Sequence, residues 1–279
     1  MRFTYGVSEF SRELIGRSGY DRDGFASVYD AARPSPPTAL LDVLLHVAQT
    51  RRARLVVDVG AGTGLSTRAW AERADEVVGV EANPAMVAQA RAATSAANVC
   101  YVEAYADDTG LPSGGADLVT CAQAFHWMEP QPVLAEAERL LRPGGVFAAY
   151  DYDVPYGFVV HPEIDEAFIA NSAARGEARR RLGCVSGSLR WPKEGHAEQI
   201  HASGRFRLVR ELLCHGWEEV DAERICGLAE SIGGTRWIFG HDAPEVGETF
   251  DRLRETAERV LGDRRVPMLV CYRVRVGIK

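Results

Sequence analysis

A run of nine residues, VVDVGAGTG from Val56 to Gly64, constrains the fold of this chain more than any other stretch. Its β-branched residues are typical of a buried strand. Its three glycines, Gly60, Gly62 and Gly64, permit a tight turn and let a ligand approach the backbone. We expect a helix to begin at Leu65, so that the backbone N–H groups of this corner face a nucleotide-like ligand. The alternative is a tight turn with no ligand.

Strands and helices alternate regularly through the first 150 residues. This alternation predicts an α/β, doubly wound, Rossmann-like fold with a mostly parallel sheet of about seven strands. We expect the sixth strand over Arg205–Cys214. The last strand, Val266–Ile278, should be antiparallel and lie at or near the edge of the sheet.

The chain reads as one domain with additions. Residues 1–50 are expected to form an N-terminal helical cap that belongs to the same domain as residues 51–279. Within the cap, Ser35 is the expected N-cap of a helix. A helix is also expected from Pro84 to Ala97. Residues 155–204 have little strand character and should form an insertion that covers the substrate.

Composition excludes several classes of protein. The 279 residues are 46% apolar, which suits a packed globular core, and the net charge of −7 argues against a nucleic-acid binder. No apolar run is long enough to cross a membrane, and no secretory signal is evident. The six cysteines are scattered without metal-ligand spacing, so we expect buried, reduced thiols and no metal. A cytoplasmic protein is the resulting expectation.

Glu81 is the residue that makes the glycine run more specific. It ends the second predicted strand, 21 residues after Gly60. In a doubly wound sheet, an acid at this position can accept hydrogen bonds from both ribose hydroxyls of a nucleotide. The alternative is a surface glutamate at the end of a strand.

Four stretches together resemble the class I S-adenosylmethionine-dependent methyltransferases: DVGAGTG, VVGVEANPAM, AYADDTGLP and LLRPGG. The chain is most similar to the small-molecule branch, whose members carry a motif like AQAFHW after the fourth strand. The resemblance implies S-adenosylmethionine as the cofactor. It also implies in-line transfer of a methyl group to an oxygen, carbon or nitrogen atom of a small acceptor, a metabolite or natural-product intermediate.

Carried over residue by residue, the resemblance assigns cofactor roles along the ends of four strands. The glycine turn would pass close to the methionine and ribose, Asp58 would hold that turn, and Glu81 would bind the ribose hydroxyls. Ala82 and Met86 would line one face of the adenine. Ala106, through its backbone N–H, and Asp107 would hydrogen-bond to the adenine edge, and Gln123 would lie near the methionine moiety. The full cofactor-binding set is Asp58, Gly60, Ala61, Gly62, Gly64, Glu81, Ala82, Met86, Ala106, Asp107 and Gln123.

Three other classes of protein share part of this sequence pattern. A nicotinamide-dependent oxidoreductase needs G-x-G-x-x-G, but Leu65 stands where the third glycine is required. A serine hydrolase needs a G-x-S-x-G elbow, which the chain lacks. A non-catalytic or regulatory protein that binds S-adenosylmethionine is compatible with every motif named above.

The chemistry of the acceptor side is less visible in the sequence. His126 is the candidate base, since imidazole titrates near neutral pH; the favoured alternative is a structural pair with Trp127.

The loop AQAFHW lacks the Pro-Pro motif that holds a flipped nucleic-acid base, so we expect a small-molecule acceptor and no nucleic acid. A homo-oligomer is compatible with the sequence. Candidate pocket aromatics are Tyr20, Phe25, Tyr29, Trp127, Tyr152, Tyr156, Trp191 and Trp237.

Overall fold

One sheet of eight strands organises the part of the chain that the computed structural model describes, residues 25–182, 191–232 and 243–279. The strand order is β3-β2-β1-β4-β5-β8-β6, and β7 pairs with the other edge of β8. The strands are β1 (Ala53–Val59), β2 (Ala74–Glu81), β3 (Val99–Glu103), β4 (Ala116–Ala122), β5 (Leu141–Tyr152), β6 (Phe158–Val159), β7 (Leu208–Val220) and β8 (Val266–Ile278).

Strands β1 to β5 pair in parallel, whereas β8 runs antiparallel to β5, β6 and β7. The predicted Rossmann-like, mostly parallel α/β fold is therefore confirmed. The helices are α2 (Phe25–Ala32), α3 (Thr38–Val47), α4 (Leu65–Ala69), α5 (Pro84–Ala92), α6 (Pro130–Leu140), α7 (Pro162–Arg181), α8 (His196–Ala202), α9 (Ala222–Glu230) and α11 (Pro244–Leu261), with short 3₁₀ turns η1 (Phe125–Trp127) and η3 (Lys193–Gly195).

The last strand is antiparallel and lies near the edge of the sheet, as predicted, but it is not the edge strand itself. β8 lies inside the sheet, between β5 and β7, and β7 occupies the edge. Its sequence shows why an interior position is stable: Val270, Tyr272, Val274 and Val276 are buried on one face, and Arg275 is buried on the other. The predicted sixth strand also starts later and runs further than Arg205–Cys214.

Two helix boundaries differ from the expectation. The helix that begins at Pro84 ends at Ala92 and does not reach Ala97. Ser35 is not the N-cap of α3, because Pro37 occupies that position. The backbone N–H of Ser35 instead donates to a carboxylate oxygen of Glu218 on β7 (3.0 Å).

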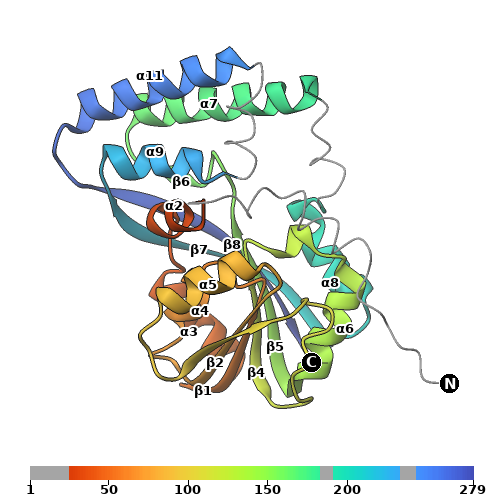
Figure 1. The fold of residues 1–279 in the computed structure, drawn as a ribbon. Coiled ribbons are helices and arrows are strands. Elements are labelled where there is room, and N and C mark those ends of the chain that lie inside the picture. The colour runs from red at the N-terminus through yellow and green to blue at the C-terminus, as the bar shows by residue number, and fades with distance from the viewer. Residues whose placement is uncertain (1–24, 183–190, 233–242) are drawn as a thin grey trace.

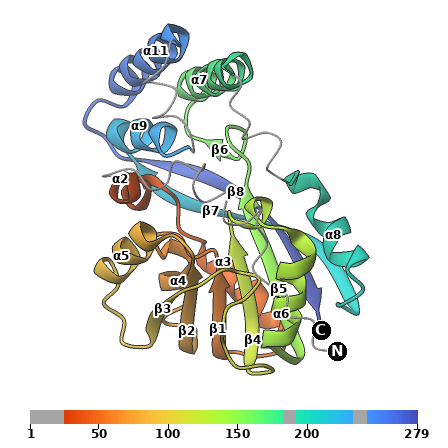
Figure 2. The same ribbon diagram turned by 45° about the vertical axis from the view of Figure 1, so that its right-hand side comes forward.

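The helices form two groups around the sheet. Helices α3, α4 and α5 cover one face of the sheet, while α6 covers the parallel strands and α8 the antiparallel strands on the other face (Figure 2). Helices α2, α7, α9 and α11 form a second layer beyond the carboxyl ends of these strands, on the extended half of β7 and β8 (Figure 1). The carboxyl ends of β1, β2, β4 and β5 therefore face the helical layer.

The described cysteines are free thiols, but not all of them are buried. Cys121 is buried, whereas Cys100 and Cys271 are exposed, so the expectation of buried thiols was wrong for these two. Neither a membrane-spanning helix nor a metal-ligating cluster occurs in the described residues.

Candidate active site

The glycine turn after β1 has the left-handed backbone that its composition predicts. Gly60, Gly62 and Gly64 have φ values of 70°, 56° and 84°. A Cβ atom on Gly60 would lie 2.5 Å from Cε of Met128 and 2.6 Å from the rigidly held Cβ of Ala124, so this position has no room for one. A Cβ on Gly62 would meet no protein atom within 4 Å. The turn is therefore packed against protein at Gly60 and open at Gly62.

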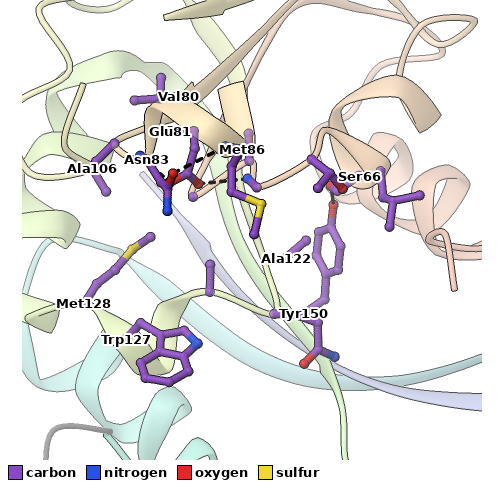
Figure 3. A pocket seen from close by; sticks show the side chains of 18 of the residues that line it. Ser66, Val80, Glu81, Asn83, Met86, Ala106, Ala122, Trp127, Met128 and Tyr150 are labelled. Carbon is purple, nitrogen blue, oxygen red and sulfur yellow. Dashed lines mark hydrogen bonds between the residues drawn. The ribbon is translucent and has the colours of Figure 1, made fainter. Parts of the chain in front are cut away.

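Glu81 joins this turn to the end of β2. Its carboxylate accepts hydrogen bonds from the backbone N–H groups of Gly62 (2.8 Å) and Asn83 (2.9 Å), as Figure 3 shows. Burial raises the pKa of Glu81, although these two N–H groups oppose the shift. The acid and the glycine turn thus form one hydrogen-bonded unit, held by adjacent parallel strands.

A cavity lies between the carboxyl ends of the strands and the helical layer. Glu81 and Asn83 line one wall of the cavity. Trp127, which ends η1, and Met128, which follows it, line another (Figure 3). The predicted residues that line the cavity are Gly60, Ala61, Gly62, Glu81, Ala82, Met86, Ala106, Asp107, Gln123, Tyr29, Trp127 and Tyr152. The sequence had not pointed to Arg33 and Tyr272, which line it as well.

Asp58 does not line the cavity and lies beneath the turn, fully buried. Its carboxylate accepts hydrogen bonds from the hydroxyls of Thr67 (2.7 Å), Thr120 (2.7 Å) and Ser66 (3.2 Å). Burial raises the pKa of Asp58 to about 6, even though the three hydroxyls favour its charged form. Asp58 thus ties β1 to β4 and to the first turn of α4.

Gln123 follows β4 and has a left-handed backbone, with φ at 52°. Its side-chain amide donates to the carbonyl oxygen of Tyr152 (3.1 Å) and accepts a hydrogen bond from the Nζ of Lys193 (3.0 Å). The ammonium group of Lys193 also donates to the carbonyl oxygen of Tyr152 (3.0 Å). The predicted insertion therefore contributes a cation directly behind one wall of the cavity.

Asp151 is the centre of a buried charged cluster next to this wall. Its carboxylate oxygens lie 3.3 Å from Lys193 Nζ, 3.4 Å from Arg275 Nη1, 3.5 Å from His196 Nδ1 and 3.6 Å from His126 Nδ1. Burial alone would raise the pKa of Asp151, but the two histidines and the lysine outweigh it and hold the pKa well below its usual range. The signal for this cluster in the sequence was an acid, Asp151, within the otherwise apolar end of strand β5.

His126 faces the cluster, because its Nδ1 lies 3.6 Å from a carboxylate oxygen of Asp151, and its buried side chain does not line the cavity. Its ring lies 5.3 Å from that of Trp127, centroid to centroid.

Gly64 also lies outside the lining of the cavity. Among the candidate aromatics, Tyr156 and Trp191 are exposed and do not line the cavity. Tyr20, Trp237 and the side chain of Phe25 lie outside the described residues.

Comparison with known proteins assigns the part of the chain that holds this site to a protein family. Residues 57–149 match the family described as a methyltransferase domain, and this range contains the glycine turn, Glu81 and Gln123. The chain carries a class I S-adenosylmethionine-dependent methyltransferase domain. The cofactor of this domain is S-adenosylmethionine. The predicted class I methyltransferase family and its cofactor are therefore confirmed, whereas membership of the small-molecule branch stays a prediction.

The relatives of this chain are also methyltransferases, but each match covers only part of the two chains compared. An uncharacterized methyltransferase of Mycobacterium tuberculosis is 39% identical over 117 residues, which are 42% of this chain and 46% of the relative. The chain spans about half the length of the curated relatives it matches.

Solved structures show the same fold over most of the chain. A putative type II methyltransferase from Anaeromyxobacter dehalogenans has a TM-score of 0.60 and 28% identity, covering 88% of this chain and 97% of its own. A phosphoethanolamine N-methyltransferase of Haemonchus contortus, solved in complex with S-adenosylmethionine, has a TM-score of 0.54 and 17% identity, covering 98% of this chain and 60% of its own. The latter similarity concerns the fold alone.

The residues of the methyltransferase domain fit its cofactor. Gly62 leaves open space where a side chain would stand, and the carboxylate of Glu81 is at the cavity wall beside it. Met86 and Ala106 add apolar surface to the same cavity, and Asp107 adds a carboxylate. A nucleoside needs this combination of hydrogen-bond acceptors and apolar walls.

Proposed function

We propose that this chain is a methyltransferase that acts on a small molecule and methylates an oxygen, carbon or nitrogen atom. One observation carries the proposal: a single cavity is lined both by the candidate cofactor residues of β1, β2 and β4 and by side chains of the helical layer. An acceptor enclosed by that layer would meet the cofactor at the carboxyl end of β4.

We further propose roles for the residues around the cofactor. Glu81 binds the ribose hydroxyls, Ala82 and Met86 pack on the adenine, and Asp107 with the backbone of Ala106 binds its edge. Gln123 contacts the methionine moiety. Gly62 has no Cβ atom and faces open space, which supports close approach of the cofactor to the turn.

Positioning is the main contribution that we assign to the protein. S-adenosylmethionine supplies both an activated methyl group and its leaving group. The chain then needs to align the acceptor and exclude water, and alignment alone can account for a large part of a rate enhancement. The aromatic side chains of Tyr29, Trp127 and Tyr152 support this role, because they line the cavity and could enclose the acceptor.

The proposal is tested by incubating the protein with S-adenosylmethionine labelled in the methyl group and a panel of small metabolites. Transfer of label to at least one acceptor, absent in the Glu81→Ala variant, is expected. Binding of the cofactor without transfer to any acceptor would favour the non-catalytic, regulatory alternative. A cytoplasmic location and a homo-oligomer stay predictions from the sequence.

A further inference from the structure

Arg33 brings a positive charge to the wall of the cavity, from the segment that follows α2. Its side chain is buried, with only 8% of the residue exposed. The guanidinium donates to the hydroxyl of Tyr152 (3.0 Å), to Oγ of Ser231 (2.8 Å) and to the carbonyl oxygen of Ser231 (3.0 Å). These bonds hold the charge in a fixed orientation between β5 and the end of α9.

Aromatic rings surround this guanidinium. Its central carbon lies 5.0 Å from the ring centroid of Tyr29 and 5.7 Å from that of Tyr152. Tyr272 packs edge-on against Tyr152, with their centroids 5.5 Å apart. All three tyrosines and Arg33 line the cavity, so a ligand there would meet a cation set in an apolar wall.

The strand order separates Arg33 from the proposed cofactor residues. Glu81 ends β2, whereas Tyr152, which holds Arg33, ends β5. The order β2-β1-β4-β5 places three strand spacings between them, roughly 14 Å. If Glu81 binds the ribose, the cofactor extends past the glycine turn of β1 toward Gln123 on β4, and Arg33 lies on the acceptor side.

A second arginine strengthens the positive field at this place. Arg175 of α7 is buried and donates to the carbonyl oxygen of Ala229, two residues before Ser231. Burial, followed by the charges of Arg179 and Arg33, lowers the pKa of Arg175 to about 9. Two arginines therefore bind carbonyl oxygens at the carboxyl end of α9, close enough for their positive charges to interact.

We infer that the acceptor carries a carboxylate, which Arg33 binds at the aromatic end of the cavity. A guanidinium matches a carboxylate in both charge and geometry, and the interaction is strong where water is excluded. The carboxylate anchors the acceptor and takes no part in a covalent step. This inference depends on the proposed function, because it assumes that the cofactor occupies the side of Glu81.

The test compares carboxylates with neutral amides of the same shape. Protein saturated with S-adenosylhomocysteine is titrated with benzoate and benzamide, and with phenylacetate and phenylacetamide. At least one carboxylate should bind about tenfold more tightly than its amide. Arg33→Met should abolish this preference, Arg33→Lys should retain part of it, and the exposed control Arg210→Met should leave it unchanged.

Several outcomes contradict the inference. One is equal binding of every carboxylate and its amide by the wild type; another is a preference that survives in Arg33→Met. If Arg33→Met does not fold, the wild type and Arg33→Lys still decide between these results. Failure of the wild type to bind S-adenosylhomocysteine at all would contradict the proposed function instead.

A carboxylate is also present on the cofactor, so its role must be separated. Arg33→Met and the wild type are titrated with S-adenosylhomocysteine and with 5′-methylthioadenosine, which lacks the amino-acid group. We expect neither affinity to change in the variant. A loss of affinity for S-adenosylhomocysteine alone would mean that Arg33 binds the cofactor carboxylate, and the inference about the acceptor would be wrong.

Discussion

The Nζ of Lys193 lies 3.0 Å from Oε1 of Gln123, and this hydrogen bond joins the insertion after β5 to the cavity wall at the end of β4. The same ammonium lies 3.3 Å from the buried carboxylate of Asp151. A change at Lys193 should therefore affect both the stability of the fold and the orientation of Gln123.

We expect Lys193→Met to lower the free energy of unfolding by about 1 to 3 kcal/mol, because it removes a hydrogen-bonded cation from a buried acid. Lys193→Arg should recover part of the loss, since it restores the charge. Denaturant unfolding of the three proteins measures this. Equal stability of Lys193→Met and the wild type would show that the contact has no energetic role.

Asp58 should make stability depend on pH in an unusual direction. Its folded-state pKa of about 6 lies above the ordinary value of 3.8, mainly because of burial. The folded protein therefore holds this proton more tightly than the unfolded chain does. Through this group alone, the free energy of unfolding falls by about 3 kcal/mol in all as pH rises from below about 4 to above about 6.

Asp58→Asn isolates that contribution, since asparagine does not titrate in this range. The difference in unfolding free energy between the wild type and the variant should shift in favour of the variant across the same pH interval. Urea unfolding at a series of pH values measures the difference. A difference that is independent of pH would contradict the assignment.

Gly64 and Gly62 offer a matched pair in one turn. A Cβ on Gly64 would lie 2.8 Å from Cζ of Tyr101, whereas one on Gly62 would meet no protein atom within 4 Å. Gly64→Ala should thus cost about 2 to 4 kcal/mol through strain and overlap, and Gly62→Ala about 1 to 2 kcal/mol through strain alone. Thermal unfolding ranks the two variants, and the reverse order would contradict the packing described for the turn.

His126 should matter for stability more than for chemistry. It is buried, lies 3.6 Å from Asp151 and does not line the cavity. We expect His126→Ala to lose about 1 to 3 kcal/mol of unfolding free energy and to keep near-normal turnover of a labelled acceptor. A large loss of turnover in a stably folded variant would instead support the base hypothesis.

The glycine turn and Glu81 could be predicted from the sequence because they depend on local spacing. Three glycines at alternate positions require a turn, and an acid at the end of the next strand must lie beside it in a parallel sheet. Neither inference needs knowledge of distant contacts.

Arg33, Lys193 and Arg275 could not be predicted in the same way. Arg33 meets Ser231, 198 residues away, through the packing of α2 against α9. Arg275 reaches Asp151 because β8 enters the sheet beside β5, which the alternation of apolar residues in β8 does not specify. A buried strand and an edge strand with one covered face can have the same pattern.

Glu81 offers the most direct test of the whole account. We predict that the wild type binds both S-adenosylmethionine and S-adenosylhomocysteine in a calorimetric titration. Glu81→Gln should bind each at least about tenfold more weakly, because it loses the charge that accepts the ribose hydroxyls. The control is Glu103→Gln, which changes an exposed acid opposite Glu81 on β3 and should bind normally. Failure of the wild type to bind either compound, or unchanged binding by a folded Glu81→Gln variant, would contradict the account.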